Sequence, residues 1–191
     1  MAGKQAKTLT DQQLRTLLTY AKSTRNPDRN NVVVLLSAKA GLRAAEIAGL
    51  TWPMVMTADG QIADTISLHD KIAKKKSGRT IPLHPSLYEA LRRLKPTACS
   101  DGPVICSERH QPMTPMSIVN WFAIAYKAIG LRGCSSHSGR RTFITRAARA
   151  VHKAGGSLRD VQLLAGHKSI EITQRYIDGD EPAQRRLVSL I

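Results

Sequence analysis

Two pairs of residues combine charge with the spacing of a helical turn. Arg43 and Glu46 lie three residues apart, so on a helix they share a face and the carboxylate can hold the guanidinium in place. His137 and Arg140 have the same spacing at the start of an expected helix, where the dipole favours an anion and one phosphate could contact both side chains. The plainer interpretation of the first pair is a surface ion pair. For Arg140 and its neighbour Arg141 it is nonspecific contact with a nucleic-acid backbone.

Tyr176 has the chemistry of a nucleophile that can attack phosphorus. A phenolate is stable enough to leave again, so a bond from tyrosine to phosphorus can store a cleaved linkage for rejoining. The free phenol has a pKa of about 10 and therefore needs a neighbouring base and cations. His167 lies nine residues earlier, on the opposite side if one helix ran through both, but a break expected at 168–169 lets the chain turn between them. The plainer interpretation of Tyr176 is a half-buried packing residue.

The charge of the chain points to a polyanionic partner. Lys and Arg total 29 against 14 Asp and Glu, a formal net charge of +15, and duplex DNA carries about one negative charge per 1.7 Å of its axis. The aromatic residues are too sparse for a surface that stacks single-stranded bases. A membrane surface is disfavoured, because the sequence has neither a spanning apolar run nor a basic amphipathic anchor, and its N-terminus lacks the apolar core of a signal peptide. We therefore expect a cytoplasmic protein that binds duplex DNA.

The cysteines and the remaining histidines do not predict a metal site. The cysteines are widely spaced, lack a CxxC or Cys/His ligand pattern and are expected to be free thiols: Cys99, Cys106 and Cys134. The four histidines outside the segments above are equally scattered: His69, His84, His110 and His152. We expect neither a bound metal nor another cofactor.

The remaining pattern predicts a mainly α fold with one small antiparallel β-sheet. Residues 65–68 and 79–83 alternate in polarity and are separated by a lysine-rich stretch with Ser77-Gly78, which indicates a β-hairpin with a basic tip. Apolar periodicity and capping residues predict the helices. They are expected from the Thr10 cap to before Asn26, and over residues 31–40, 44–48, 85–94, 115–129, 138–154, 157–165 and 170–177. Residues 183–191 are also compatible with a helix.

Four short segments occur in an order and spacing that closely resemble the tyrosine recombinases, also called phage integrases. They are Gly41-Leu42-Arg43-Ala44-Ala45-Glu46, the Lys74–Leu83 hairpin, His137-Ser138-Gly139-Arg140, and Leu164-Ala165-Gly166-His167 followed by Tyr176. The resemblance extends from about Leu9 to Asp178. It implies the catalytic fold of that family, and an enzyme that cleaves and rejoins duplex DNA at specific sites through a 3′-phosphotyrosine intermediate on Tyr176.

The resemblance also implies a role for each candidate residue. Arg43 and Arg140 would contact the scissile phosphate, and Glu46 would support Arg43. His137 would help as the proton acceptor. His167 would add to the positive groups around the phenol.

A lysine of the hairpin would protonate the departing 5′ oxygen. Counting back from the second strand places this role at Lys74, and an offset within the hairpin would move it to Lys76. The plainer interpretation is that the lysines make solvated contacts with the DNA backbone. Further DNA contacts are expected from Lys75, Arg79, Arg141 and Lys168.

The expected domain organisation is a catalytic domain over residues 1–180 and a tail over residues 181–191. Only 42 residues precede Arg43, so the N-terminal helical domain with which most relatives wrap DNA cannot fit. The chain resembles either a short recombinase of the fimbrial-switch type or an excised domain. We expect the apolar tail to dock on a neighbouring protomer or to pack on its own domain.

The expected partner is double-stranded DNA with specific recombination sites, bound by a dimer to tetramer of this chain. An accessory DNA-bending protein is a further candidate partner. Three other functions stay open. A type IB topoisomerase-like enzyme would share the site but relax supercoils without exchanging strands. A non-catalytic DNA-binding regulator would keep the fold, but it would have no need of Tyr176. A basic RNA-associated domain is disfavoured, because the sequence lacks RNA-binding aromatic motifs.

Overall fold

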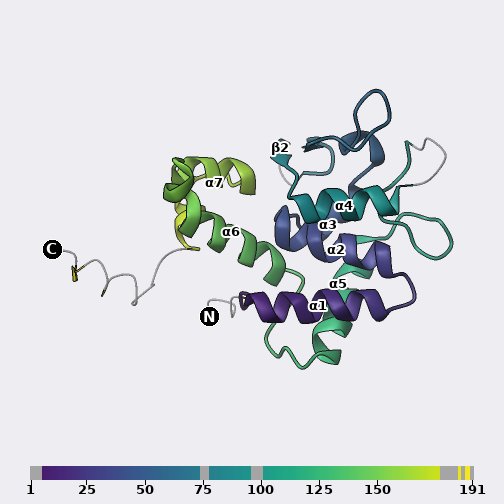
Figure 1. Cartoon of the computed structure of the whole chain (residues 1–191), viewed down its shortest axis with the longest axis horizontal. Helices are drawn as coiled ribbons and strands as arrows, with labels where there is room; N and C mark the ends of the chain where they lie inside the picture. The colour runs from purple at the N-terminus through teal and green to yellow at the C-terminus, as the bar shows by residue number, and fades with distance from the viewer. Residues whose placement is uncertain (1–5, 74–77, 96–100, 177–184, 186–187, 190–191) are drawn as a thin grey trace.

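Two unequal groups of elements make up the fold, and Figure 1 shows them side by side. The structure, a computed structural model of the chain, describes residues 6–73, 78–95, 101–176, 185, 188 and 189. In chain order the elements are α1 (Asp11–Ser23), α2 (Pro27–Lys39), α3 (Ala44–Gly49), the 3-10 helix η1 (Trp52–Met54), β1 (Thr65–Leu68), β2 (Arg79–Pro82), α4 (Pro85–Leu94), α5 (Pro115–Ala128), α6 (Ser138–Ala150), the 3-10 helix η2 (Val151–Ala154), α7 (Leu158–Ala165) and α8 (Ile170–Gln174). The mainly α fold with a small antiparallel sheet is therefore confirmed.

The helix α2 is the centre of the larger group. Its residues 32–38 are all buried, and it packs against α1, α4 and α6, which explains why its sequence lacks a polar face. The helix begins at Pro27 rather than at residue 31, because proline fits the first position of a helix, where its missing N–H is not needed. Together with α1, α3, α4, α5 and the sheet, α2 forms the main core.

The two strands pair in an antiparallel sheet, with Ile66 opposite Ile81 and Leu68 opposite Arg79. Both isoleucines are buried in the main core, and the alternation of inward and outward side chains along the strands agrees with the sequence pattern. The lysine-rich stretch 74–77 lies outside the described residues. The strands of the predicted hairpin are thus confirmed, and its basic tip stays a prediction.

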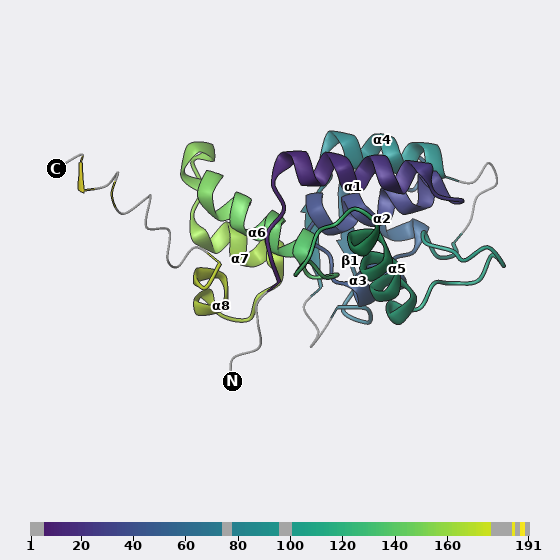
Figure 2. The same cartoon turned by 90° about the horizontal axis from the view of Figure 1, so that it is seen from below.

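The smaller group, here called the small lobe, comprises residues 143–176 and contains the second part of α6, η2, α7 and α8. Figure 2 shows these elements gathered at one end of the molecule. Among the described residues, the core of this lobe consists of five buried side chains: Ile144, Ala148, Val151, Val161 and Ala165. The small lobe is joined to the main core by α6, which packs against α2, and by α7, which contacts β2.

Two helices of the small lobe end earlier than expected. The α-helix α6 gives way to η2 at Val151, and Gly155, with a φ of 71°, ends that turn in the left-handed conformation. The helix α8 ends at Gln174, because the backbone N–H of Tyr176 donates to the carbonyl of Thr173, which tightens the last turn. Tyr176 therefore lies in a turn after the helix. The expected helix at 183–191 falls largely outside the described residues.

Within the described ranges, no helix is long and apolar enough to cross a membrane. The side chains described there also include no group of three or more His, Cys, Asp and Glu that could hold a metal ion, and the expectation of metal-independent chemistry stays a prediction. Cys106 and Cys134 are free thiols, as expected. Cys99 lies outside the described residues.

Candidate active site

An open pocket of about 670 Å³ lies where the start of α3, the start of α6 and the α7–α8 segment meet. Of the six catalytic residues expected from the sequence, the structure describes five, and all five line this pocket: Arg43, His137, Arg140, His167 and Tyr176. Arg141 and Lys168, two of the expected DNA contacts, line it as well. Lys74, Lys75 and Lys76 lie outside the described residues. The fold thus brings distant segments to one place and gives that place a strong positive charge.

Glu46 is the buried anchor on the main-core side of the pocket. It is 1% exposed, and its carboxylate accepts a hydrogen bond from the backbone N–H of Arg43 at 2.9 Å and one from Nη1 of the same residue at 2.9 Å. Burial alone would raise the pKa of this carboxyl, but the hydrogen bonds and positive charges of Arg79 and Arg43 outweigh it, so the pKa lies below its ordinary value. Glu46 therefore stays ionised and orients Arg43, whose side chain is 25% exposed beside the pocket.

Arg79, expected from the sequence to contact DNA, has a buried side chain. Its side chain is 6% exposed, and its guanidinium pairs with Glu46. The reason is the register of β2, since residues two apart on a strand face the same side, and Ile81 faces the main core. The alternation in the sequence contained this signal, but the charge of the residue favoured a surface position.

Arg140 lies at the base of the pocket and connects the two groups of elements. It is 4% exposed, and its two terminal nitrogens donate to the carbonyl of Gly41 on the main-core side and, at 2.7 Å, to the carbonyl of Ala165 at the end of α7. Burial lowers the pKa of this guanidinium to about 10, and the charges of Arg43 and Arg79 act in the same direction. At neutral pH the side chain is still positively charged, so it can bind an anion in the pocket.

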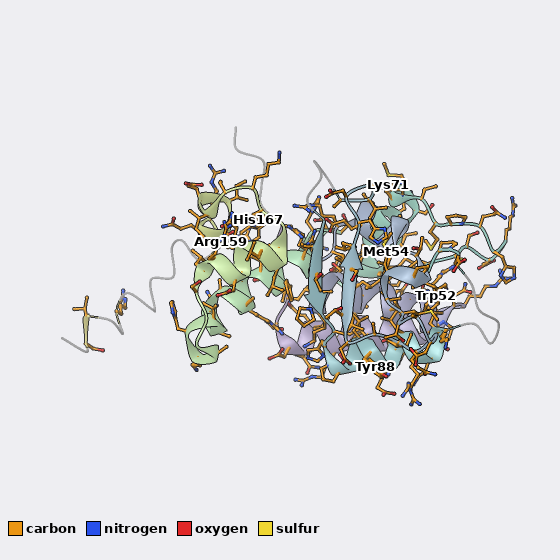
Figure 3. The ribbon with its side chains drawn as sticks, turned by 90° about the horizontal axis from the view of Figure 1, so that it is seen from above. Trp52, Met54, Lys71, Tyr88, Arg159 and His167 are labelled. Atoms are coloured by element: carbon orange, nitrogen blue, oxygen red, sulfur yellow. The ribbon has the colours of Figure 1, made fainter. Side chains whose placement is uncertain are left out.

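His167 follows the glycine that ends α7 and lies on the small-lobe side of the pocket (Figure 3). Its Nδ1 is hydrogen-bonded to the hydroxyl of Thr173 at 2.9 Å, and its carbonyl accepts from Nε2 of Gln162 at 3.0 Å. Burial, together with the charges of Arg140 and Arg43, lowers its pKa to about 4. The imidazole is therefore neutral at pH 7. We expected a positively charged imidazole at this position, and the structure instead favours a neutral imidazole that forms hydrogen bonds.

Tyr176 packs directly against this histidine. The two rings are stacked, with their centroids 5.4 Å apart and an angle of 24° between their planes. The guanidinium carbon of Arg141 lies 5.9 Å from the centroid of the tyrosine ring, and the Tyr176 carbonyl accepts from Oγ1 of Thr145 at 3.4 Å. The predicted break between the two residues is present, since Ser169 has an extended backbone and caps α8. The turn brings together two side chains that a continuous helix would separate.

His137 and Lys168 lie at the exposed edge of the pocket. His137 is the N-cap residue of α6 and is solvent-exposed, one turn before the buried Arg140. Lys168 is exposed next to His167. Behind this edge Gly139 lies against α2, where a Cβ atom would be 2.3 Å from Oγ of Ser37. The close approach of α6 to α2 therefore requires glycine at position 139.

Comparison with known proteins identifies relatives over most of the chain. Residues 7–182 match the model of the phage integrase family. The chain is 30% identical over 184 residues to tyrosine recombinase XerC of Agrobacterium fabrum, covering 91% of this chain and 55% of that protein. It is 28% identical over 193 residues to the transposase of transposon Tn916 from Enterococcus faecalis, covering 88% of this chain and 46% of that protein. The chain thus spans about half the length of the curated relatives it matches.

Solved structures of low sequence identity have the same fold. A post-cleavage complex of the XerH site-specific recombinase with palindromic difH substrate aligns with a TM-score of 0.75 at 20% identity, covering 99% of this chain and 54% of that one. The crystal structure of XerA recombinase aligns with a TM-score of 0.72 at 21% identity, covering 100% of this chain and 65% of that one. By its match to the family model and by its fold, the chain belongs to the phage integrase family of tyrosine recombinases.

Proposed function

We propose that the chain cleaves and rejoins duplex DNA at specific sites, with Tyr176 as the nucleophile. The observation that carries the proposal is the pocket itself, in which the expected catalytic residues described by the structure meet from distant segments: Arg43, His137, Arg140, His167 and Tyr176. Family membership and the net charge of +15 support it. Neither observation favours the two alternatives, a type IB topoisomerase-like enzyme that relaxes supercoils and a non-catalytic DNA-binding regulator.

The cleavage step is a transesterification at one phosphate of the DNA backbone. The Oη atom of Tyr176 attacks the phosphorus, a 3′-phosphotyrosyl bond forms, and the bond from phosphorus to the 5′ oxygen breaks. The phenolic proton passes to the imidazole of His137, and the 5′ oxygen takes a proton from a hairpin lysine, Lys74 or Lys76. Attack by a 5′ hydroxyl reverses these events and rejoins the strand, so the step needs neither an oxidant nor a nucleotide.

The buried groups stabilise the charge that develops on the phosphate. Arg43 and Arg140, which both line the pocket, would donate to its non-bridging oxygens, and a guanidinium held by buried partners does this with little reorganisation. His167 is neutral in the free protein, so its part is to form a hydrogen bond with a phosphate oxygen. Stacking on Tyr176 also fixes the ring of the nucleophile.

The partners follow from the same proposal. We infer that the chain acts on double-stranded DNA with specific recombination sites, as a dimer to tetramer. One structural neighbour is a lambda integrase dimer bound to a core site, and others are Tn1549 transposon integrase in complex with DNA, which supports a DNA-bound assembly. An accessory DNA-bending protein and docking of the tail over residues 181–191 on a neighbouring copy remain predictions.

Replacement of the nucleophile is the direct test. Wild-type protein mixed with a nicked duplex, from which the leaving strand diffuses away, should accumulate a covalent protein–DNA adduct on a denaturing gel. Tyr176→Phe removes the hydroxyl and keeps the ring, so the adduct should vanish while DNA affinity stays within about threefold, since phosphate contacts dominate affinity. Equal adduct from both proteins would overturn the proposal. Strand exchange between two sites, against relaxation of any supercoiled plasmid, separates a recombinase from a type IB enzyme.

A further inference from the structure

Arg79 uses its guanidinium to join three segments of the chain. Its terminal nitrogens Nη1 and Nη2 donate to Oε1 and Oε2 of Glu46 at 3.0 and 3.1 Å, and its Nε donates to the carbonyl of Leu164 at 2.8 Å. A planar guanidinium that makes a two-fold contact with a carboxylate and a third contact with a carbonyl has little freedom to rotate. Arg79 therefore fixes β2, the start of α3 and the end of α7 relative to one another.

The contacts continue from Arg79 to both sides of the pocket. On one side, Oε1 of Glu46 accepts from Nη1 of Arg43 as well, so the two arginines share one buried carboxylate. On the other side, Leu164 lies three residues before His167, and Gly166 packs against the guanidinium. A Cβ atom at Gly166 would lie 2.8 Å from Nη1 of Arg79. Any displacement of Arg79 would therefore reach Arg43 and the segment that leads to His167.

We propose that Arg79 is a positioning residue of the active site, which holds Glu46 and thereby orients the Arg43 guanidinium toward the bound phosphate. The inference rests on the proposed function. Arg79 is 6% exposed and is not among the described residues that line the pocket. It acts on the reaction through Glu46, without contact with DNA.

Arg79→Lys is the informative substitution. Lysine keeps the positive charge beside Glu46, but an ammonium group cannot bond both carboxylate oxygens and the Leu164 carbonyl in the same geometry. We expect the rate of adduct formation on the nicked duplex to fall about 10- to 100-fold, as for other small displacements of a catalytic group. DNA affinity should change less than threefold. The matched control is Arg92→Lys, which alters an exposed arginine that pairs with Glu89 on α4, and which should leave the rate unchanged.

A second substrate distinguishes positioning from a general loss of structure. A methylphosphonate at the scissile position carries no negative charge, because a methyl group replaces one non-bridging oxygen, and a guanidinium that balances this charge then matters less. On this substrate the rate of adduct formation by Arg43→Ala should lie much closer to the wild-type rate than it does on the phosphate substrate. The rate of Arg79→Lys should likewise come to within about threefold of the wild-type rate. If Arg79→Lys only reduced the fraction of folded protein, its rates on the phosphate and on the methylphosphonate substrate would fall by the same factor, and the ratio of these two rates would stay as in wild type. If Arg79→Lys does not fold at all, Arg79→Gln takes its place in the same comparison.

The outcomes separate this inference from the proposed function. Absence of any adduct from wild-type protein would reject the proposed function itself. If wild-type protein reacts and the Arg79 variant reacts equally fast on the phosphate substrate, Arg79 has no positioning role. A defect of the same size on both substrates would also overturn the inference, because Arg79 would then act on something other than Arg43. A defect relieved by methylphosphonate supports it.

Discussion

The two sides of the pocket are supported by hydrophobic cores of very different size. The side with Arg43 and Glu46 is part of the main core, built around the buried helix α2. The side with His167 and Tyr176 belongs to the small lobe, whose described core has five buried side chains, with Tyr176 itself packed at its edge. Local stability follows the amount of buried apolar packing. The side with Arg43 and Glu46 should therefore be the more rigid part, and the segment that carries His167 and Tyr176 should open more easily.

Arg140 holds these two unequal parts together, so its removal should have the largest effect. Arg140→Ala deletes hydrogen bonds to Gly41 and Ala165 and leaves both carbonyls without this buried partner. It also deletes a cation from the pocket. We expect the cleavage rate to fall about 100- to 1000-fold and the free energy of unfolding to fall by about 2 kcal/mol. Single-turnover adduct formation and urea denaturation measure the two quantities, and a rate within threefold of wild type would contradict the account.

Equal truncations in the two cores test the difference in stability directly. Ile144 and Leu36 are both fully buried, and truncation of either to alanine should cost about 2–5 kcal/mol. Leu36→Ala should destabilise the whole protein. Ile144→Ala should raise amide hydrogen exchange in residues 158–176 while residues 27–39 stay protected, because the small lobe can open by itself. Uniformly faster exchange in both variants would show that the two parts unfold as one unit.

The titration of His167 tests the small-lobe side of the pocket. Its pKa is lowered from the ordinary 6.5 to about 4 by burial and by the arginines, so the unfolded chain binds a proton here more readily than the folded one. The free energy of unfolding should therefore fall as the pH is lowered from about 6.5 to about 4. In His167→Gln, urea denaturation across this range should show a weaker pH dependence. The same slope in both proteins would mean that the imidazole titrates normally.

The elements could be predicted from the sequence because they depend on local patterns, whereas the meeting of the candidate residues was implied by the resemblance to the tyrosine recombinases. The period of apolar residues and the capping residues identify the helices, and the alternation around residues 65–83 identifies the hairpin. The turn between His167 and Tyr176 followed from the expected cap at Ser169. These features are set within a few neighbouring residues.

The electrostatic state of the site could not be predicted, because it depends on burial by distant segments. The buried carboxylate that pairs with Arg79 belongs to Glu46, 33 residues earlier in the chain. Arg140 becomes a structural link as well as a clamp, since the carbonyls it binds belong to two separate parts of the fold. The lowered pKa of His167 likewise depends on burial and on the charges of arginines from three other segments.

The most direct test of the central claim is to identify the side chain that carries the DNA. Wild-type protein is trapped on a nicked duplex, digested with nuclease and protease, and its peptides are weighed by mass spectrometry. We predict that the nucleotide remnant is attached to the phenol of Tyr176, next to His167 in the pocket. Attachment to another residue, such as the buried Tyr126 of the main core, would contradict the account.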